Sequence, residues 1–176
     1  MQDGQLRLDT TPTQLVNDTN DAPVLTEPAP SGDYVVETQV SLDVPATGTG
    51  FDGVQAGLVV YGGDDRYLKL VQVAVGDTRQ TAFAQEVPTA PNGGTLRYGG
   101  TPAGPPGDAT WLRVTKKRSA THSYLRADTS RDGTHWVRGA SYRYDGLGSH
   151  ERIGLLSMGG AGFSAHFDHV RVWPVS

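Results

Sequence analysis

The chain has no cysteine, no long hydrophobic run and no large excess of charge of either sign. Without cysteine it forms no disulfide, holds no zinc through thiolates and has no thiol nucleophile. Its longest apolar run, residues 57–61, is far too short to cross a bilayer, so we expect no membrane partner. The net charge of −4, from 15 basic and 19 acidic residues, provides no positive field for a phosphate backbone. Nucleic acid is therefore not an expected partner.

Glycine and proline are common: 23 and 11 residues of the 176. This composition is typical of many short strands joined by turns. Apolar and polar residues alternate repeatedly, and no segment keeps the period of a helix for more than about two turns. We therefore predict strands at 35–42, 54–61, 67–75, 80–87, 111–115, 123–129, 134–140, 152–158 and 165–173.

Two stretches lack regular alternation, an N-terminal irregular segment at 9–33 and a long loop at 87–108 rich in proline and glycine. Neither a repeat nor a break in composition marks a second domain, so we expect one domain over residues 1–176. The number of strands is typical of two packed sheets. The predicted fold class is all-β, a two-sheet antiparallel β-sandwich, either a jelly roll or another sandwich.

Several strings, taken in order, match a known pattern: Gln55–Tyr61, Asp64–Leu70, Trp111–Val114, Thr129–Trp136 and Phe167–Val172. They resemble the concanavalin A-like jelly-roll domain at the C-terminus of family 43 β-xylosidases, a lectin-like β-sandwich. The resemblance implies a jelly roll that accompanies carbohydrate-active enzymes in secreted bacterial proteins. The expected partners are then a poly- or oligosaccharide and a covalently linked catalytic domain. We expect an extracellular location, although the polar start of the chain carries no export signal.

Strand alternation gathers polar and aromatic residues on one predicted face. If Leu112 and Leu125 face the core, the residues beside them on these neighbouring strands face away. These residues are Trp111, Arg113, Tyr124, Arg126 and Asp128, joined by Glu37, Gln55 and Lys69 if their strands belong to the same sheet. Aromatic rings pack on the C–H face of a sugar, while arginine and carboxylates pair with its hydroxyls. These eight residues are the predicted carbohydrate-binding residues.

The same pattern also fits an ordinary exposed sheet face, where cross-strand Arg–Asp pairs stabilise by roughly 0.2–1 kcal/mol. Trp136 and Trp173 are expected to be structural, with Trp136 packing in the core. The main functional hypothesis is a non-catalytic carbohydrate-binding or accessory module of a secreted glycan-degrading protein. The alternatives are a structural domain that buttresses a catalytic domain and, less expected, a small jelly-roll glycoside hydrolase or lyase.

Catalysis by the chain itself is not expected. Glycoside hydrolysis needs two carboxylates at a defined separation, and the candidates, which sit in no recognisable catalytic motif, are Glu37, Glu86, Asp128 and Glu151. We assign no catalytic residue and expect no required cofactor.

A structural calcium ion is the favoured metal hypothesis. Asp18 and Asp21 lie close together in the irregular segment, and their hard oxygen ligands suit Ca²⁺. Asp168 resembles the last-strand aspartate that binds calcium in related sandwich modules. Such residues also commonly cap turns. His166, Asp168 and His169 could converge on a metal only if their strand contained a bulge.

Overall fold

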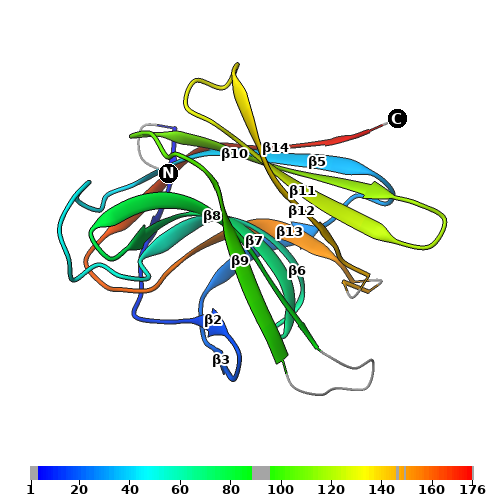
Figure 1. Cartoon of the computed structure of the whole chain (residues 1–176), viewed down its shortest axis with the longest axis horizontal. Helices are drawn as coiled ribbons and strands as arrows, with labels where there is room; N and C mark the ends of the chain where they lie inside the picture. The colour runs from blue at the N-terminus through cyan, green and yellow to red at the C-terminus, as the bar shows by residue number, and fades with distance from the viewer. Residues whose placement is uncertain (1–3, 89–95, 146, 149, 176) are drawn as a thin grey trace.

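The computed structural model describes residues 4–88, 96–145, 147–148 and 150–175. These residues form an all-β sandwich, a concanavalin A-like jelly roll whose two antiparallel sheets pack face to face (Figure 1). The described ranges contain no helix that is long and apolar enough to cross a membrane. Sheet I contains, in spatial order, β1 (Leu6–Asp9), β14 (Ser164–Pro174), β5 (Tyr34–Leu42), β10 (Thr110–Arg118), β11 (Ser123–Ser130) and β12 (Trp136–Arg143).

Sheet II contains, in spatial order, β4 (Val24–Pro28), β13 (Arg152–Met158), β6 (Gln55–Gly63), β7 (Arg66–Val75), β8 (Thr78–Pro88) and β9 (Leu96–Gly104). A separate hairpin of β2 (Leu15–Val16) and β3 (Thr19–Asn20) lies below sheet II in Figure 1. Each of the predicted strands is present, with ends that differ by a few residues.

The main core lies between the two sheets. Sheet I contributes Val36, Leu112 and Leu125, and sheet II contributes Leu70 and Phe83, all fully buried. Each such side chain stabilises the fold by about 1.5–3 kcal/mol through removal of apolar surface from water.

A second apolar cluster covers the outer face of sheet II. Leu15 of the β2–β3 hairpin packs there with Val59, Tyr67, Val71 and Leu156. Strand β6 is consequently buried on both sides, as its nearly continuous apolar sequence predicts. The hairpin thus leaves the outer face of sheet I as the more open of the two.

The two predicted irregular stretches need correction. The segment 9–33 contains the β2–β3 hairpin and strand β4, and the segment 87–108 contains β9. Residues 89–95 of the predicted loop lie outside the described residues. Both β4 and β9 are edge strands, where proline is tolerated because one side of the backbone needs no ladder partner. The glycines and the proline of β9 therefore hide the alternation that marks the inner strands.

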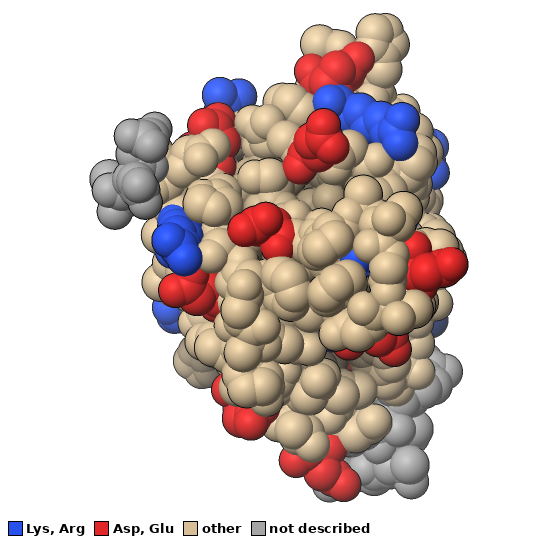
Figure 2. Space-filling model, turned by 90° about the vertical axis from the view of Figure 1, so that its left-hand side faces the viewer, with Lys and Arg blue, Asp and Glu red and all other residues tan. Residues whose placement is uncertain are grey.

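Charge is dispersed at the end of the sandwich that carries the loop between β5 and β6. Figure 2 views this end and shows Asp and Glu side chains spread over a surface that is otherwise mostly uncharged. No single-sign patch dominates this view, in keeping with the small net charge.

Candidate carbohydrate-binding face

All three tryptophans of the chain lie on the outer face of sheet I, and none belongs to the apolar core. Trp111 in β10 is opposite Ser130 in β11, which in turn is opposite Trp136 in β12. Trp173 in β14 is opposite Val35 in β5. Exposed aromatic rings gathered on one face are a common feature of recognition surfaces rather than of structural cores.

Arg113 links two of these rings. Its guanidinium carbon lies 3.5 Å from the centroid of the Trp136 ring and 5.8 Å from that of Trp173. Its Nε and Nη2 donate to one oxygen of the buried Glu37 carboxylate at 2.8 and 2.6 Å. Because the ion pair fixes the guanidinium, it also fixes the distance at which the two indoles flank it.

The turn between β11 and β12 holds two of the indoles in place. The Trp136 Nε1 donates to the Gly133 carbonyl at 3.2 Å, and a side chain at Gly133 would meet the Trp111 Nε1 at 3.0 Å. Gly133 has a φ of +74°, which suits glycine. Trp173 is 37% exposed, whereas Trp111 and Trp136 are less exposed, so its ring is the most open of the three to a ligand.

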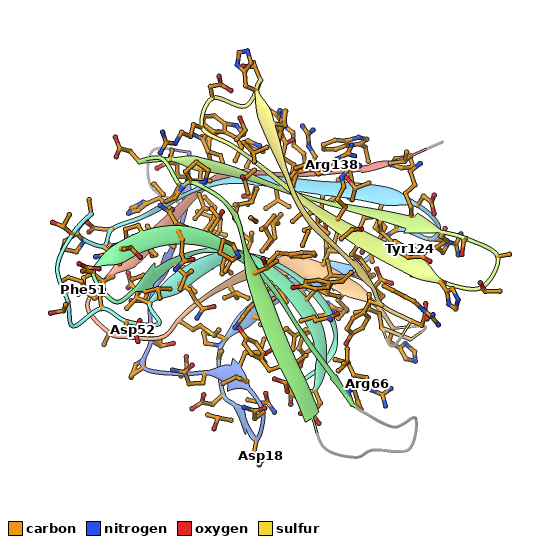
Figure 3. All side chains as sticks on the ribbon, in the orientation of Figure 1. Asp18, Phe51, Asp52, Arg66, Tyr124 and Arg138 are labelled. Carbon is orange, nitrogen blue, oxygen red and sulfur yellow. The ribbon has the colours of Figure 1, made fainter. Side chains whose placement is uncertain are left out.

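A second ion pair lies beside the first. Arg126 Nε donates to Asp128 at 2.9 Å, and Asp128 is opposite Arg113 across the β10–β11 ladder. Tyr124 lies further along β11 on the same face and is exposed; Figure 3 labels it near the end of the strand. The structure therefore brings together six of the eight predicted residues: Trp111, Arg113, Tyr124, Arg126, Asp128 and Glu37.

Gln55 and Lys69 are not on this face, because β6 and β7 belong to sheet II. The Gln55 Nε2 donates to the Gly53 carbonyl at 2.9 Å, so this side chain stabilises the loop before β6. Lys69 is only 3% exposed under the β2–β3 hairpin, where its Nζ donates to the Leu15 carbonyl at 3.4 Å. Burial lowers the pKa of Lys69 to about 8, although the nearby Glu86 carboxylate opposes the shift.

The expectation that Trp136 packs in the core is wrong, and β-bulges explain the outward direction of both Trp136 and Trp173. Strand β14 has a bulge between Phe167 and Val170, so Phe167 faces the core while Trp173, six residues later, faces outward. The β11–β12 pairing has a bulge too, so Trp136 and Tyr142 lie on opposite faces although both positions are even. A bulge reverses the alternation that a regular strand would give.

The bulge in β14 also brings His169 to the outer face of sheet I. Its Nε2 lies 3.6 Å from the second oxygen of Glu37, and Asp168 lies 3.2 Å from its Nδ1. Sequence alternation alone did not identify His169, since a regular strand would not place it beside Glu37. His169, Trp136 and Trp173 are the residues of this face that sequence reasoning missed.

The four carboxylates considered for catalysis occupy three separate places. Glu37 and Asp128 are held by arginines on the outer face of sheet I. Glu86 lies under the β2–β3 hairpin and accepts a hydrogen bond from the Asn17 backbone at 2.7 Å. Glu151 is paired with Lys116 and accepts a hydrogen bond from the Tyr34 hydroxyl. Each carboxylate is thus engaged in a structural contact.

The residues predicted to bind calcium do not fit such a site. Asp18 lies at the tip of the β2–β3 hairpin (Figure 3), and Asp168 is in β14 of sheet I. Asp21 accepts a hydrogen bond from the Gln14 backbone at 2.8 Å, which is a turn-forming role. Within the described ranges, no group of three or more acidic or histidine side chains is arranged to hold a metal.

Comparison with known proteins supports the fold. No family model matches the chain, and no curated protein matches it either. A functionally unknown protein from Saccharomyces cerevisiae is similar in structure, with 16% identity and a TM-score of 0.71; the match covers 100% of this chain and 91% of that one. The GH43 protein BlXynB from Bacillus licheniformis is also similar in structure, with 16% identity and a TM-score of 0.72. That match covers 97% of this chain and 33% of BlXynB.

A legume lectin-like domain from Entamoeba histolytica is also similar, with 10% identity and a TM-score of 0.58; the match covers 97% of this chain and 90% of that one. At these identities the likeness concerns the fold alone. The chain spans about a third of the length of the GH43 protein, and the sandwich resembles the concanavalin A-like domain at the C-terminus of GH43 xylosidases.

Proposed function

We propose that this chain is a non-catalytic carbohydrate-binding accessory module of an exported glycan-degrading protein. The observation that carries the proposal is the gathering of all three tryptophans on the outer face of sheet I, next to two arginine–carboxylate pairs. The fold likeness to a GH43 protein and to a legume lectin-like domain supports the same interpretation.

In this proposal Trp173 supplies the stacking surface. A pyranose or furanose ring packs its C–H face on the indole, and hydroxyls of a further sugar unit of the same oligosaccharide exchange hydrogen bonds with Arg126 and Asp128, which lie three strands away. Arg113 acts as a positioning residue, since its ion pair with Glu37 fixes the rings of Trp136 and Trp173. A single module of this kind binds weakly, and a covalent link to an enzyme raises the effective concentration of the sugar.

The proposal is tested by binding to insoluble xylan, arabinan and β-glucan in pull-down assays with the full chain. We expect retention on at least one polysaccharide, lost in Trp173→Ala. Tyr98→Ala is the matched control, because Tyr98 is 43% exposed on sheet II and should leave retention unchanged.

Two results would contradict the proposal. One is equal retention of the wild-type chain and Trp173→Ala. The other is release of reducing sugar by the wild-type chain that Asp128→Asn or Glu86→Gln abolishes, because it would identify the chain as an enzyme. Absence of retention on all three polysaccharides would instead favour a domain that only buttresses a catalytic neighbour.

A further inference from the structure

A hollow of about 870 Å³ opens at the end of the sandwich that Figure 2 faces. It lies between the chain that follows β5, the β7–β8 turn and the connection from β9 to β10, and none of the tryptophans lines it. Its volume is within the range of about 300–1,000 Å³ found for ligand sites. The residues that define its chemistry are Leu42, Val44, Gln72, Arg79, Pro106 and Asp108.

Arg79 has hydrogen-bond donors that the fold does not use. Its Nη1 donates to the Thr78 carbonyl at 2.7 Å, and its guanidinium carbon lies 5.4 Å from the centroid of the Phe51 ring. Its Nε and Nη2 are buried and have no hydrogen-bond partner among the residues that the structure describes. Leaving such donors unpaired is costly in a folded protein, so the two N–H groups call for an acceptor.

Gln72 presents the complementary group. Its side chain is 6% exposed, and its Nε2 donates to the Gly107 carbonyl at 3.1 Å. That bond fixes the amide orientation and leaves Oε1 buried, with no partner in the described part of the chain. The hollow therefore contains an unpaired pair of donors on Arg79 and an unpaired acceptor on Gln72.

The other charged groups of the hollow do not supply the missing acceptor. Arg131 donates through Nε and Nη2 to the Pro106 carbonyl at 3.0 and 2.8 Å. Asp77 and Asp108 are exposed on the rim, and neither accepts a hydrogen bond from Arg79. The side chains that line the hollow therefore leave the Nε and Nη2 of Arg79 without an acceptor.

We infer that this hollow, here named the end cavity, binds the uronic acid residue of an acidic oligosaccharide. The Nε and Nη2 of Arg79 lie on one edge of a planar guanidinium, an arrangement that matches the two oxygens of a carboxylate. A ring hydroxyl donates to Gln72 Oε1, and the apolar side chains of Leu42, Val44 and Pro106 face the C–H groups of the ring. This inference rests on the proposed carbohydrate-binding function and adds a site separate from the tryptophans.

The inference is tested with glucuronate and glucose, which differ in the carboxylate at C6. In NMR titrations of the full chain, glucuronate should shift the amide and side-chain signals of Gln72, Arg79 and Gly107, and glucose at equal concentration should not. Arg79→Lys keeps the charge but loses the planar fork, so it should weaken glucuronate binding by roughly tenfold or more. Arg118→Lys, an exposed arginine beside Asp33, is the control and should bind as the wild type does.

Several outcomes would overturn the inference. They are equal shifts with glucose, unchanged affinity in a folded Arg79→Lys variant, and no shift with glucuronate at any soluble concentration. Xylan retention that needs Trp173 would still stand in each case, so the proposed function and this inference can fail separately. Conversely, glucuronate binding should persist in Trp173→Ala, and its loss there would contradict two separate sites.

Discussion

The guanidinium of Arg113 stacks on the ring of Trp136 at 3.5 Å, on the outer face of sheet I rather than inside the sandwich. The same guanidinium is held by the buried carboxylate of Glu37. Arg113 therefore connects the Glu37 carboxylate to the Trp136 ring. The arrangement of side chains on the outer face of sheet I depends on this one ion pair. The stability of this pair can be measured directly.

We expect Arg113→Met to lower the free energy of unfolding by about 2 kcal/mol, because it leaves the Glu37 carboxylate buried without its partner. The double variant Arg113→Met, Glu37→Gln should lose less unfolding free energy than the two single variants lose together. The difference, which is the coupling free energy of the pair, should be about 1 kcal/mol. Urea unfolding of the four proteins checks this. The exposed pair Arg143–Asp145 is the matched control, with an expected coupling below about 0.5 kcal/mol; equal couplings would contradict the account.

The buried Lys69 should make stability depend on pH. Its pKa is about 8 in the folded state, against the ordinary lysine pKa of 10.5 in the unfolded chain. Between these values the unfolded chain binds the extra proton, so stability rises with pH. Above about pH 10 the buried Tyr67 and the partly exposed Tyr98, whose pKa values are both raised by desolvation, oppose the rise. From pH 8 to 10 we expect a gain of about 2 kcal/mol in unfolding free energy.

Lys69→Met removes the titrating group and should flatten the profile over this range. Urea unfolding at several pH values compares the two proteins. A profile that is flat in the wild type, or an equal rise in Lys69→Met, would contradict the buried position of the ammonium group.

Gly57 marks a close approach of backbone in the centre of sheet II. A β-carbon there would lie 2.8 Å from the Val71 Cα and 2.9 Å from the Leu112 Cδ1, and closer still to the Leu70 carbonyl oxygen. Gly57→Ala should therefore destabilise the chain by about 3 kcal/mol through overpacking. Gly99→Ala, where a β-carbon meets nothing within 4 Å, is the control in thermal unfolding and should change little. Similar melting temperatures for both variants would contradict the close approach of the β7 backbone to Gly57.

The inner strands could be predicted from sequence because burial enforces their alternation. Leu112 and Leu125 face the core as expected, so the outward direction of Trp111, Arg113 and Asp128 follows from the pleat. Edge strands such as β9 could not be predicted in the same way, since an edge strand with one free side tolerates the glycines and prolines that elsewhere mark loops.

Two further features of the structure could not be predicted from the sequence: the sheet to which each strand belongs, and the positions of the β-bulges. Alternation indicates which side of a strand Lys69 occupies, but not that β7 pairs with β6 and β8 in the other sheet. Because of the bulge after Phe167, the Trp173 side chain faces outward instead of toward the core, and no local residue pattern predicts this bulge. Sequence reasoning therefore misplaced Trp136 and left the direction of Trp173 open.

The most direct measurement follows the three indole N–H signals in NMR spectra while xylo-oligosaccharides are added to the full chain. If the outer face of sheet I binds sugar, the Trp173 signal should shift most and the Trp136 signal should follow. In Trp173→Ala, which keeps only the Trp111 and Trp136 signals, the Trp136 shift should disappear. Saturable binding that leaves all three indole signals unchanged would contradict the account, because the sugar would then bind elsewhere on the molecule.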